Sequence, residues 1–133
     1  MGFSRAVISE QGLNRRARTG DGALMHLRRT NQTTDSNQTI SVAAILGGLY
    51  SRSGINTNRT DTTETAANIL AAMPEMDIGD TYTFMVSNAT ANPLVIAGGT
   101  NVTASGNLTV PALVSRWFVL EKISATAMTL YGC

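Results

Sequence analysis

Hydrophobic and polar residues alternate along much of the second half of the chain. Between residues 81 and 88, Tyr82, Phe84 and Val86 alternate with threonine and serine, which is the pattern of a strand with one buried face. Further short apolar segments follow, separated by turn-forming sequences such as NATANP, GGTN and ASGN. These segments lie at residues 94–97, 102–103, 108–110, 113–123 and 128–131. Short strands at this spacing predict a small antiparallel β-sandwich or jelly roll.

The segment 113–123 differs from the others because it is apolar on both alternating faces. One face carries Leu113, Trp117 and Val119, and the other carries Val114, Phe118 and Leu120. A strand buried on both faces needs two covers, and in so small a domain only one of them is the second sheet. We therefore predict a homo-oligomer, a trimer or a dimer, with Leu113, Trp117 and Val119 at the subunit interface.

One helix interrupts the strand pattern. Asp61 precedes Glu64 by three residues, which is the spacing of a capping box, and the alanine-rich sequence that follows ends at Pro74. The sequence therefore predicts one short α-helix whose start is capped by Asp61. Its apolar stripe, expected to lie over a sheet edge, consists of Ala66, Ile69, Leu70 and Met73.

The remainder of the chain divides into an arm, a linker and a body. Residues 1–30 contain scattered apolar residues without sustained spacing, and they predict an extended N-terminal arm that becomes ordered on a neighbour. Residues 31–39 are uniformly polar and predict a linker. Residues 40–133 form the predicted body, where Ile40–Leu46 is too short to decide between a helical turn and a buried strand.

Composition limits the class of protein. The chain has 133 residues, enough for one domain with an arm, and only 14% of them are charged, against about 25% in average soluble domains. A surface built from neutral threonine, asparagine and serine suits packing between subunits. No apolar run approaches the ~20 residues of a membrane helix, and the N-terminus lacks the apolar core of a signal peptide. We therefore expect no membrane partner, and synthesis in a cytoplasm.

Charge is distributed unevenly between arm and body. Residues 1–30 hold six arginines against two acidic residues, a net charge of +4, whereas residues 31–133 hold four basic and seven acidic residues, a net charge of −3. Arginine favours bidentate contact with carboxylates or phosphates. The arm has only one aromatic residue for base stacking, so an acidic protein surface is the favoured partner over a solvated tail or nucleic acid. The candidate binding residues are Phe3, Arg5, Val7, Ile8, Leu13, Arg15, Arg16, Arg18, Arg28 and Arg29.

Candidate chemistry is sparse. His26 is the sole histidine and has no cysteine or second histidine beside it to form a zinc set. Glu75, Asp77 and Asp80 lie in one turn, but they lack the ligand number and the defining glycine of a calcium loop. The only cysteine, Cys133, is the last residue, which excludes an internal disulfide. We predict no metal, no cofactor and no enzymatic activity.

The sequence also carries a family resemblance. The block DTTETAANILAAMPEMDIGDTYTFMVSN, followed by AGGTNVT, a hydrophobic strand pair and the ending MTLYG, resembles small capsid decoration (cement) proteins of tailed bacteriophages. Similar sequence occurs in phage head-fibre and tail-fibre modules, and the resemblance covers about residues 39–132. It implies an oligomeric β-sandwich or jelly-roll body on the outer surface of the capsid, where it clamps neighbouring copies of the major capsid protein.

Two other functions remain open from the sequence. A receptor-binding tip of a phage head or tail fibre would use the same β body, on a stalk supplied by another chain. Copy number separates it from a cement protein, which is present in numbers comparable to the capsid subunit. A basic-armed nucleic-acid binder would be retained on DNA in a salt-sensitive manner.

Overall fold

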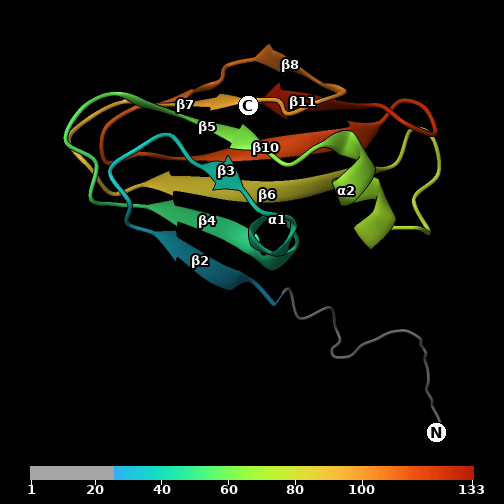
Figure 1. Ribbon diagram of the computed structural model, residues 1–133, viewed down its shortest axis with the longest axis horizontal. Helices are drawn as coiled ribbons and strands as arrows, with labels where there is room; N and C mark the ends of the chain where they lie inside the picture. Colours follow the sequence, from blue (N-terminus) through green and yellow to red (C-terminus); the bar gives the residue numbers. More distant parts are fainter. Residues whose placement is uncertain (1–25) are drawn as a thin grey trace, which may run out of the picture.

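The structure is a computed structural model that describes residues 26–133. It is mainly β and sandwich-like, as the sequence predicts, with two sheets (Figure 1). The six-stranded sheet contains, in spatial order, β2 (Arg28–Gln32), β4 (Gly48–Arg52), β6 (Thr81–Asn88), β10 (Ser115–Lys122), β11 (Met128–Gly132) and β8 (Val102–Gly106). The four-stranded sheet contains β3 (Thr39–Ile40), β5 (Arg59–Thr63), β7 (Leu94–Ala97) and β9 (Thr109–Val110).

The strand directions correct the prediction of an antiparallel sandwich. Strands β2, β4 and β6 are parallel, as are β3, β5 and β7, and β8 pairs in parallel with β11. The antiparallel pairs are β6 with β10, β10 with β11, and β7 with β9. From β2 to β10 the chain changes sheet at every strand. It therefore returns to each sheet through a crossover, as parallel pairing requires. Among the strands of residues 26–133, only β10 and β11 are consecutive within one sheet, and they are antiparallel neighbours.

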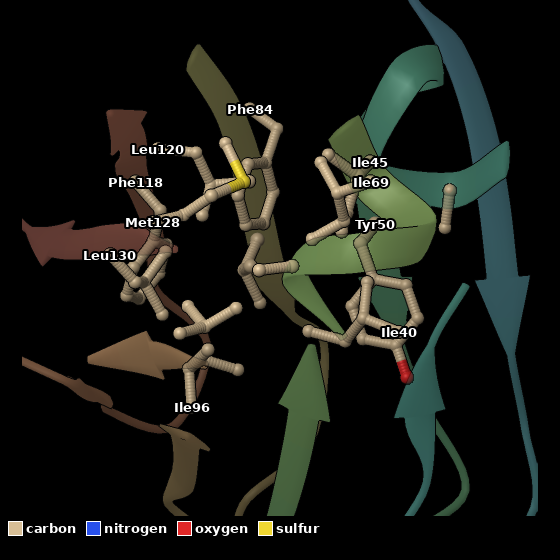
Figure 2. Packing of buried hydrophobic residues seen from close by; sticks show 14 of the residues in the cluster. Ile40, Ile45, Tyr50, Ile69, Phe84, Ile96, Phe118, Leu120, Met128 and Leu130 are labelled. Carbon is tan, nitrogen blue, oxygen red and sulfur yellow. The ribbon is translucent and has the colours of Figure 1, made fainter. Parts of the chain in front are cut away.

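The core lies between the two sheets. Figure 2 shows inward side chains of the six-stranded sheet meeting Ile96 of the four-stranded sheet. Phe84 and Phe118 are register partners on β6 and β10, and their rings stack with centroids 5.9 Å apart. The predicted alternation of β6 is confirmed, because Phe84 and Val86 are fully buried.

Two helices lie together at one end of the sandwich (Figure 1). The first, α1 (Val42–Gly47), begins where the Ser41 hydroxyl accepts a hydrogen bond from the Ala44 amide at 3.1 Å. It ends at Gly48, whose φ of 88° suits the left-handed C-cap of a helix. The segment 40–46, left undecided by its sequence, therefore enters from a strand at Ile40 and becomes a helix.

The second helix, α2 (Ala66–Ala72), is capped four residues later than predicted, at Thr65 instead of Asp61. Asp61 belongs to β5, and the helix N-cap is Thr65, whose hydroxyl accepts from the Asn68 amide at 3.2 Å. The helix ends before Pro74, and its apolar face packs on the core, as expected. Its stripe residues Ala66, Ile69 and Met73 are buried, and Leu70 is partly buried. With α1 present, the prediction of a single helix is wrong.

The expected boundary between arm and linker falls inside a strand. Residues 28–32 form β2 at the edge of the six-stranded sheet, where exposed or half-buried polar side chains are compatible with strand pairing. Residues 1–25 of the predicted arm lie outside the described part of the chain.

Candidate functional site

The predicted capsid-binding residues divide between described and undescribed parts of the chain. Arg28 and Arg29 lie on β2, and both are exposed. The other predicted positions fall outside the described residues, namely Phe3, Arg5, Val7, Ile8, Leu13, Arg15, Arg16 and Arg18. The structure therefore puts a positively charged pair at the sheet edge where residues 1–25 join the body.

A hollow of about 560 Å³ lies beside Arg28. Its walls come from the residues before and at the start of β2 and from helix α1, and they are His26, Leu27, Arg28, Ala43, Leu46 and Gly47. Gly47 allows α1 to approach β2 closely, because a Cβ at this position would lie 2.5 Å from the Arg28 carbonyl oxygen. The position of the basic pair thus depends on a close contact between backbone and backbone.

The predicted oligomer residues are only partly brought together. Trp117 and Val119 both point away from the core, since Phe118 and Leu120 between and beside them are fully buried. Leu113 precedes the strand, in a turn with φ of 60°, and is 76% exposed. The segment is thus not a strand buried twice: one face packs in the core, and Trp117, 39% exposed, lies on the other.

Trp117 belongs to an apolar row that crosses three neighbouring strands. Met85 is the register partner of Trp117 on β6, and Leu49 is the register partner of Met85 on β4. We call these three residues the apolar row. Val119 and Tyr131, which are register partners on β10 and β11, extend the apolar surface beside it. Sequence reasoning missed Leu49 and Met85, because their alignment depends on which strands pair and in what register.

Polar side chains surround the apolar row on the same outer face of the six-stranded sheet. On one side, Ser115 donates to the Ser87 hydroxyl at 2.9 Å. On the other side, the Tyr131 hydroxyl donates to the Glu121 carboxylate at 2.7 Å, and this hydrogen bond raises the pKa of Tyr131. By the alternation of the strands, Arg29 and Glu121 are the charged residues of this face among the strands that the structure describes. We call this surface, with the apolar row at its centre, the outer face.

A buried charged network joins the two sheets on their inner side. Arg52 of β4 donates from Nε to the Asp61 carboxylate of β5 at 2.7 Å, and both side chains are fully buried. The Tyr50 hydroxyl donates to the same carboxylate oxygen at 2.7 Å. Burial, and the hydrogen bond from Tyr50 to the Asp61 carboxylate, raise the pKa of Tyr50. Asp61 therefore serves as an acceptor in the core and not as a helix cap.

The same network holds the connection between β2 and β3. Arg52 donates from Nη1 to the Thr34 carbonyl at 2.7 Å and from Nη2 to the Ser36 carbonyl at 2.5 Å. The other Asp61 oxygen accepts from the Gln38 amide at 3.0 Å. A polar segment that the sequence predicts as a linker is thereby fixed by charged groups of the core.

A second, exposed cluster holds the same segment from outside. Arg59 donates from Nη2 to the Asp35 carboxylate at 3.0 Å, and the Asn56 amide donates to it at 3.1 Å. The hydrogen bond from the Asn56 backbone and that from Arg59 lower the pKa of Asp35. Solvent screening makes this exposed pair a weak contributor to stability.

The residues considered for metal chemistry do not converge. Asp80 accepts a hydrogen bond from the Asp77 amide at 2.9 Å, which closes the turn after α2. Among residues 26–133, no group of three or more histidine, cysteine, aspartate or glutamate side chains is placed to hold a metal ion. In the same part of the chain, no helix is long and apolar enough to cross a membrane.

Comparisons with known proteins returned no relative. No protein-family model matches the sequence, and no curated protein and no solved structure matches the chain.

Proposed function

We propose that the protein is a structural component of a bacteriophage particle, a decoration protein that binds the outside of the head and strengthens contacts between major capsid subunits. The observation that carries this proposal is the segregation of charge. Six arginines occur in residues 1–30 against a net charge of −3 in the rest of the chain. Arg28 and Arg29, the last two of these arginines, are exposed on the edge strand β2. The sequence resemblance to phage cement proteins supports the same proposal.

In this function the N-terminal arm binds the capsid surface and the β body projects from it. Arginines of the arm pair with capsid carboxylates, where the planar guanidinium makes two parallel hydrogen bonds. Phe3, Val7, Ile8 and Leu13 occupy apolar grooves on the capsid surface. No covalent chemistry is involved, so the protein acts only through binding free energy.

An oligomer with several arms can bind the capsid tightly even if each arm binds weakly. Once one arm of an oligomer is bound, the other arms are held near the shell at high effective concentration, and overall attachment exceeds that of a single arm by orders of magnitude. A protein that contacts several capsid subunits adds contacts that must all break before the seam between those subunits opens.

The test measures attachment to purified heads that lack the protein. A variant with R15Q, R16Q and R18Q is incubated with heads beside the unaltered chain, and the bound copies per capsid subunit are counted after sedimentation. We expect occupancy to fall at least tenfold in the glutamine variant. The matched control is the triple lysine variant R15K, R16K and R18K, which keeps the charge and loses the planar fork.

The control also reports how the arginines act. Partial attachment by the lysine variant, with a steeper loss at high salt, supports charge pairing with bidentate recognition. Full occupancy of the glutamine variant would overturn the proposed role of the arm. Copy numbers far below that of the capsid subunit would favour a fibre tip instead.

A further inference from the structure

We propose that the outer face of the six-stranded sheet is a two-fold interface between copies of this chain, in which Trp117 of each copy covers Met85 of the other. The inference deepens the proposed function, since multivalent attachment needs more than one copy. It can be tested on the isolated chain, so either idea can fail without the other.

The symmetry follows from the strand order. Strands β6 and β10 are the central pair of the six, and Met85 and Trp117 are register partners on them. An axis that runs parallel to the strands between β6 and β10 exchanges these two positions when a second copy packs face to face. The sulfur of Met85 then meets the indole of the other copy, a favourable contact between thioether and aromatic ring.

Because this axis is parallel to the strands, each residue faces a residue of the other copy at the same height along the strand direction. The apolar row of one copy therefore lies over the apolar row of the other, and hydroxyl groups lie over hydroxyl groups. Leu49 on β4 faces β11, because these strands lie at equal distances from the axis. Arg29 and Glu121 both lie off the axis, so neither faces its own copy and no like charges meet.

The size and composition of the face fit a stable dimer. Six strands at about 4.8 Å spacing and a central strand of eight residues span roughly 600 Å², or about 1,200 Å² for two copies. That exceeds the ~1,000 Å² expected of a specific interface. Its centre is apolar and aromatic and its rim is polar, which is the usual anatomy of protein interfaces.

The first experiment measures the mass of the full chain by sedimentation equilibrium. We expect a dimer, and we expect W117E and M85E each to shift the equilibrium to monomer by at least a hundredfold in dissociation constant. The control is I78E, which places the same charge on a residue that is 69% exposed and lies outside both sheets. Circular dichroism shows whether each variant retains the β fold.

The second experiment tests the geometry with a thiol cross-link. Cys133 continues the register of β11 and donates its amide to the Trp117 carbonyl at 3.3 Å. Within one copy, Leu49 and Cys133 are three strand spacings apart, about 14 Å. Across the axis they face each other at the ~10 Å spacing of packed sheets, which is too far for a disulfide but within reach of a short bis-maleimide. L49C should therefore be cross-linked to Cys133 of a second copy by a short bis-maleimide, whereas I78C should give little covalent dimer.

Each contrary outcome overturns the inference. A trimer, or a dimer that survives both W117E and M85E, would place the contact elsewhere. Trp117 is the only tryptophan, so its fluorescence reports on this face alone. A monomer in which Trp117 is shielded from iodide would show that another segment of the same chain covers the face. A monomer with accessible Trp117 would show that nothing covers it.

Discussion

The Arg52 guanidinium and the Asp61 carboxylate form an ion pair across the interior of the sandwich, at 2.7 Å and without exposure to solvent. Arg52 is on the six-stranded sheet and Asp61 on the four-stranded sheet. Buried charges are tolerated only when their hydrogen-bonding groups are satisfied. Here backbone groups of the β2–β3 connection and the Tyr50 hydroxyl complete the set, so the pair fixes both the register of the sheets and the path of the connection.

Removal of one partner of this pair should be costly. D61A leaves the Arg52 charge buried and uncompensated, and we expect the free energy of unfolding to fall by about 3–5 kcal/mol. Urea denaturation followed by circular dichroism measures the change. D35A, which breaks the exposed pair with Arg59, is the matched control and should change stability little. Equal effects of the two substitutions would show that burial does not govern the contribution of Asp61.

The same pair explains one error of the sequence prediction. Asp61 and Glu64 satisfy the spacing of a capping box, and nothing in the local sequence excludes that reading. Asp61 is instead recruited by Arg52, nine residues earlier, in a contact that depends on how the two sheets stack. The actual N-cap, Thr65, is also of a residue type that is preferred at helix N-termini.

The strand alternation was predictable, and the strand directions were not. Buried Phe84 and Val86 alternate with more exposed residues, as a period of two requires. A period of two does not record whether the neighbouring strand is parallel. Here direction is set by a chain that changes sheet at each strand up to β10. For the same reason the outer face could be predicted only in part: Trp117 and Val119 share one strand, whereas Met85 and Leu49 join them through pairing.

Alkaline pH should destabilise the fold through Tyr50. Its pKa is raised in the folded state by burial and by the hydrogen bond to Asp61, so its contribution is fully present below the unfolded pKa of about 10. Above that pH the unfolded chain loses a proton that the native chain retains. The free energy of unfolding should then fall by about 1.4 kcal/mol per pH unit for this group. Unfolding measured between pH 8 and 11.5 tests the slope.

A phenylalanine variant isolates the contribution of Tyr50 to the pH dependence of stability. Y50F lowers stability at neutral pH, because one Asp61 oxygen loses a donor, and its stability should depend less steeply on pH above 10. Y131F is the comparison: the hydrogen bond to Glu121 also raises the pKa of Tyr131, but this hydroxyl is exposed, so Y131F should reduce the alkaline slope less than Y50F does. An unchanged alkaline slope in Y50F would contradict the assignment.

Leu113 should be replaceable with a gain in stability. Its φ of 60° is in the left-handed region, and its side chain is 76% exposed, so little burial offsets the strain. Asparagine tolerates this conformation better than leucine does. We expect L113N to raise the free energy of unfolding by about 1 kcal/mol. The reciprocal control is Asn101, with φ of 62°, where N101L should destabilise.

The same variant separates Leu113 from the outer face. The proposed two-fold interface does not include this turn, so L113N should leave the mass of the oligomer unchanged. Dissociation of the oligomer by L113N would favour an interface at the loop end of the sandwich over one on the sheet.

Gly47 links the fold of the body to the placement of the basic edge. A Cβ at this position would lie 2.5 Å from the Arg28 carbonyl oxygen. Alanine ordinarily favours a helix over glycine by about 1 kcal/mol, but here it forces β2 away from α1. We expect G47A to destabilise the protein and to accelerate hydrogen exchange at the β2 amides that pair with β4, with the core strands β6 and β10 less affected.

The control for Gly47 is Gly79, a glycine with open space around the position of an added Cβ. Gly79 has no atom within 4 Å of an added Cβ, and its φ of 95° is better tolerated by asparagine than by other residues. G79N should therefore leave exchange on β2 unchanged. If the β2 amides exchanged as slowly in G47A as in the natural protein, the close approach of α1 would not be what positions the strand. A different result would connect this edge to capsid binding. If G47A accelerated exchange on β2 and also lowered attachment to heads, and G79N did neither, then capsid binding would depend on the position of the strand that carries Arg28 and Arg29.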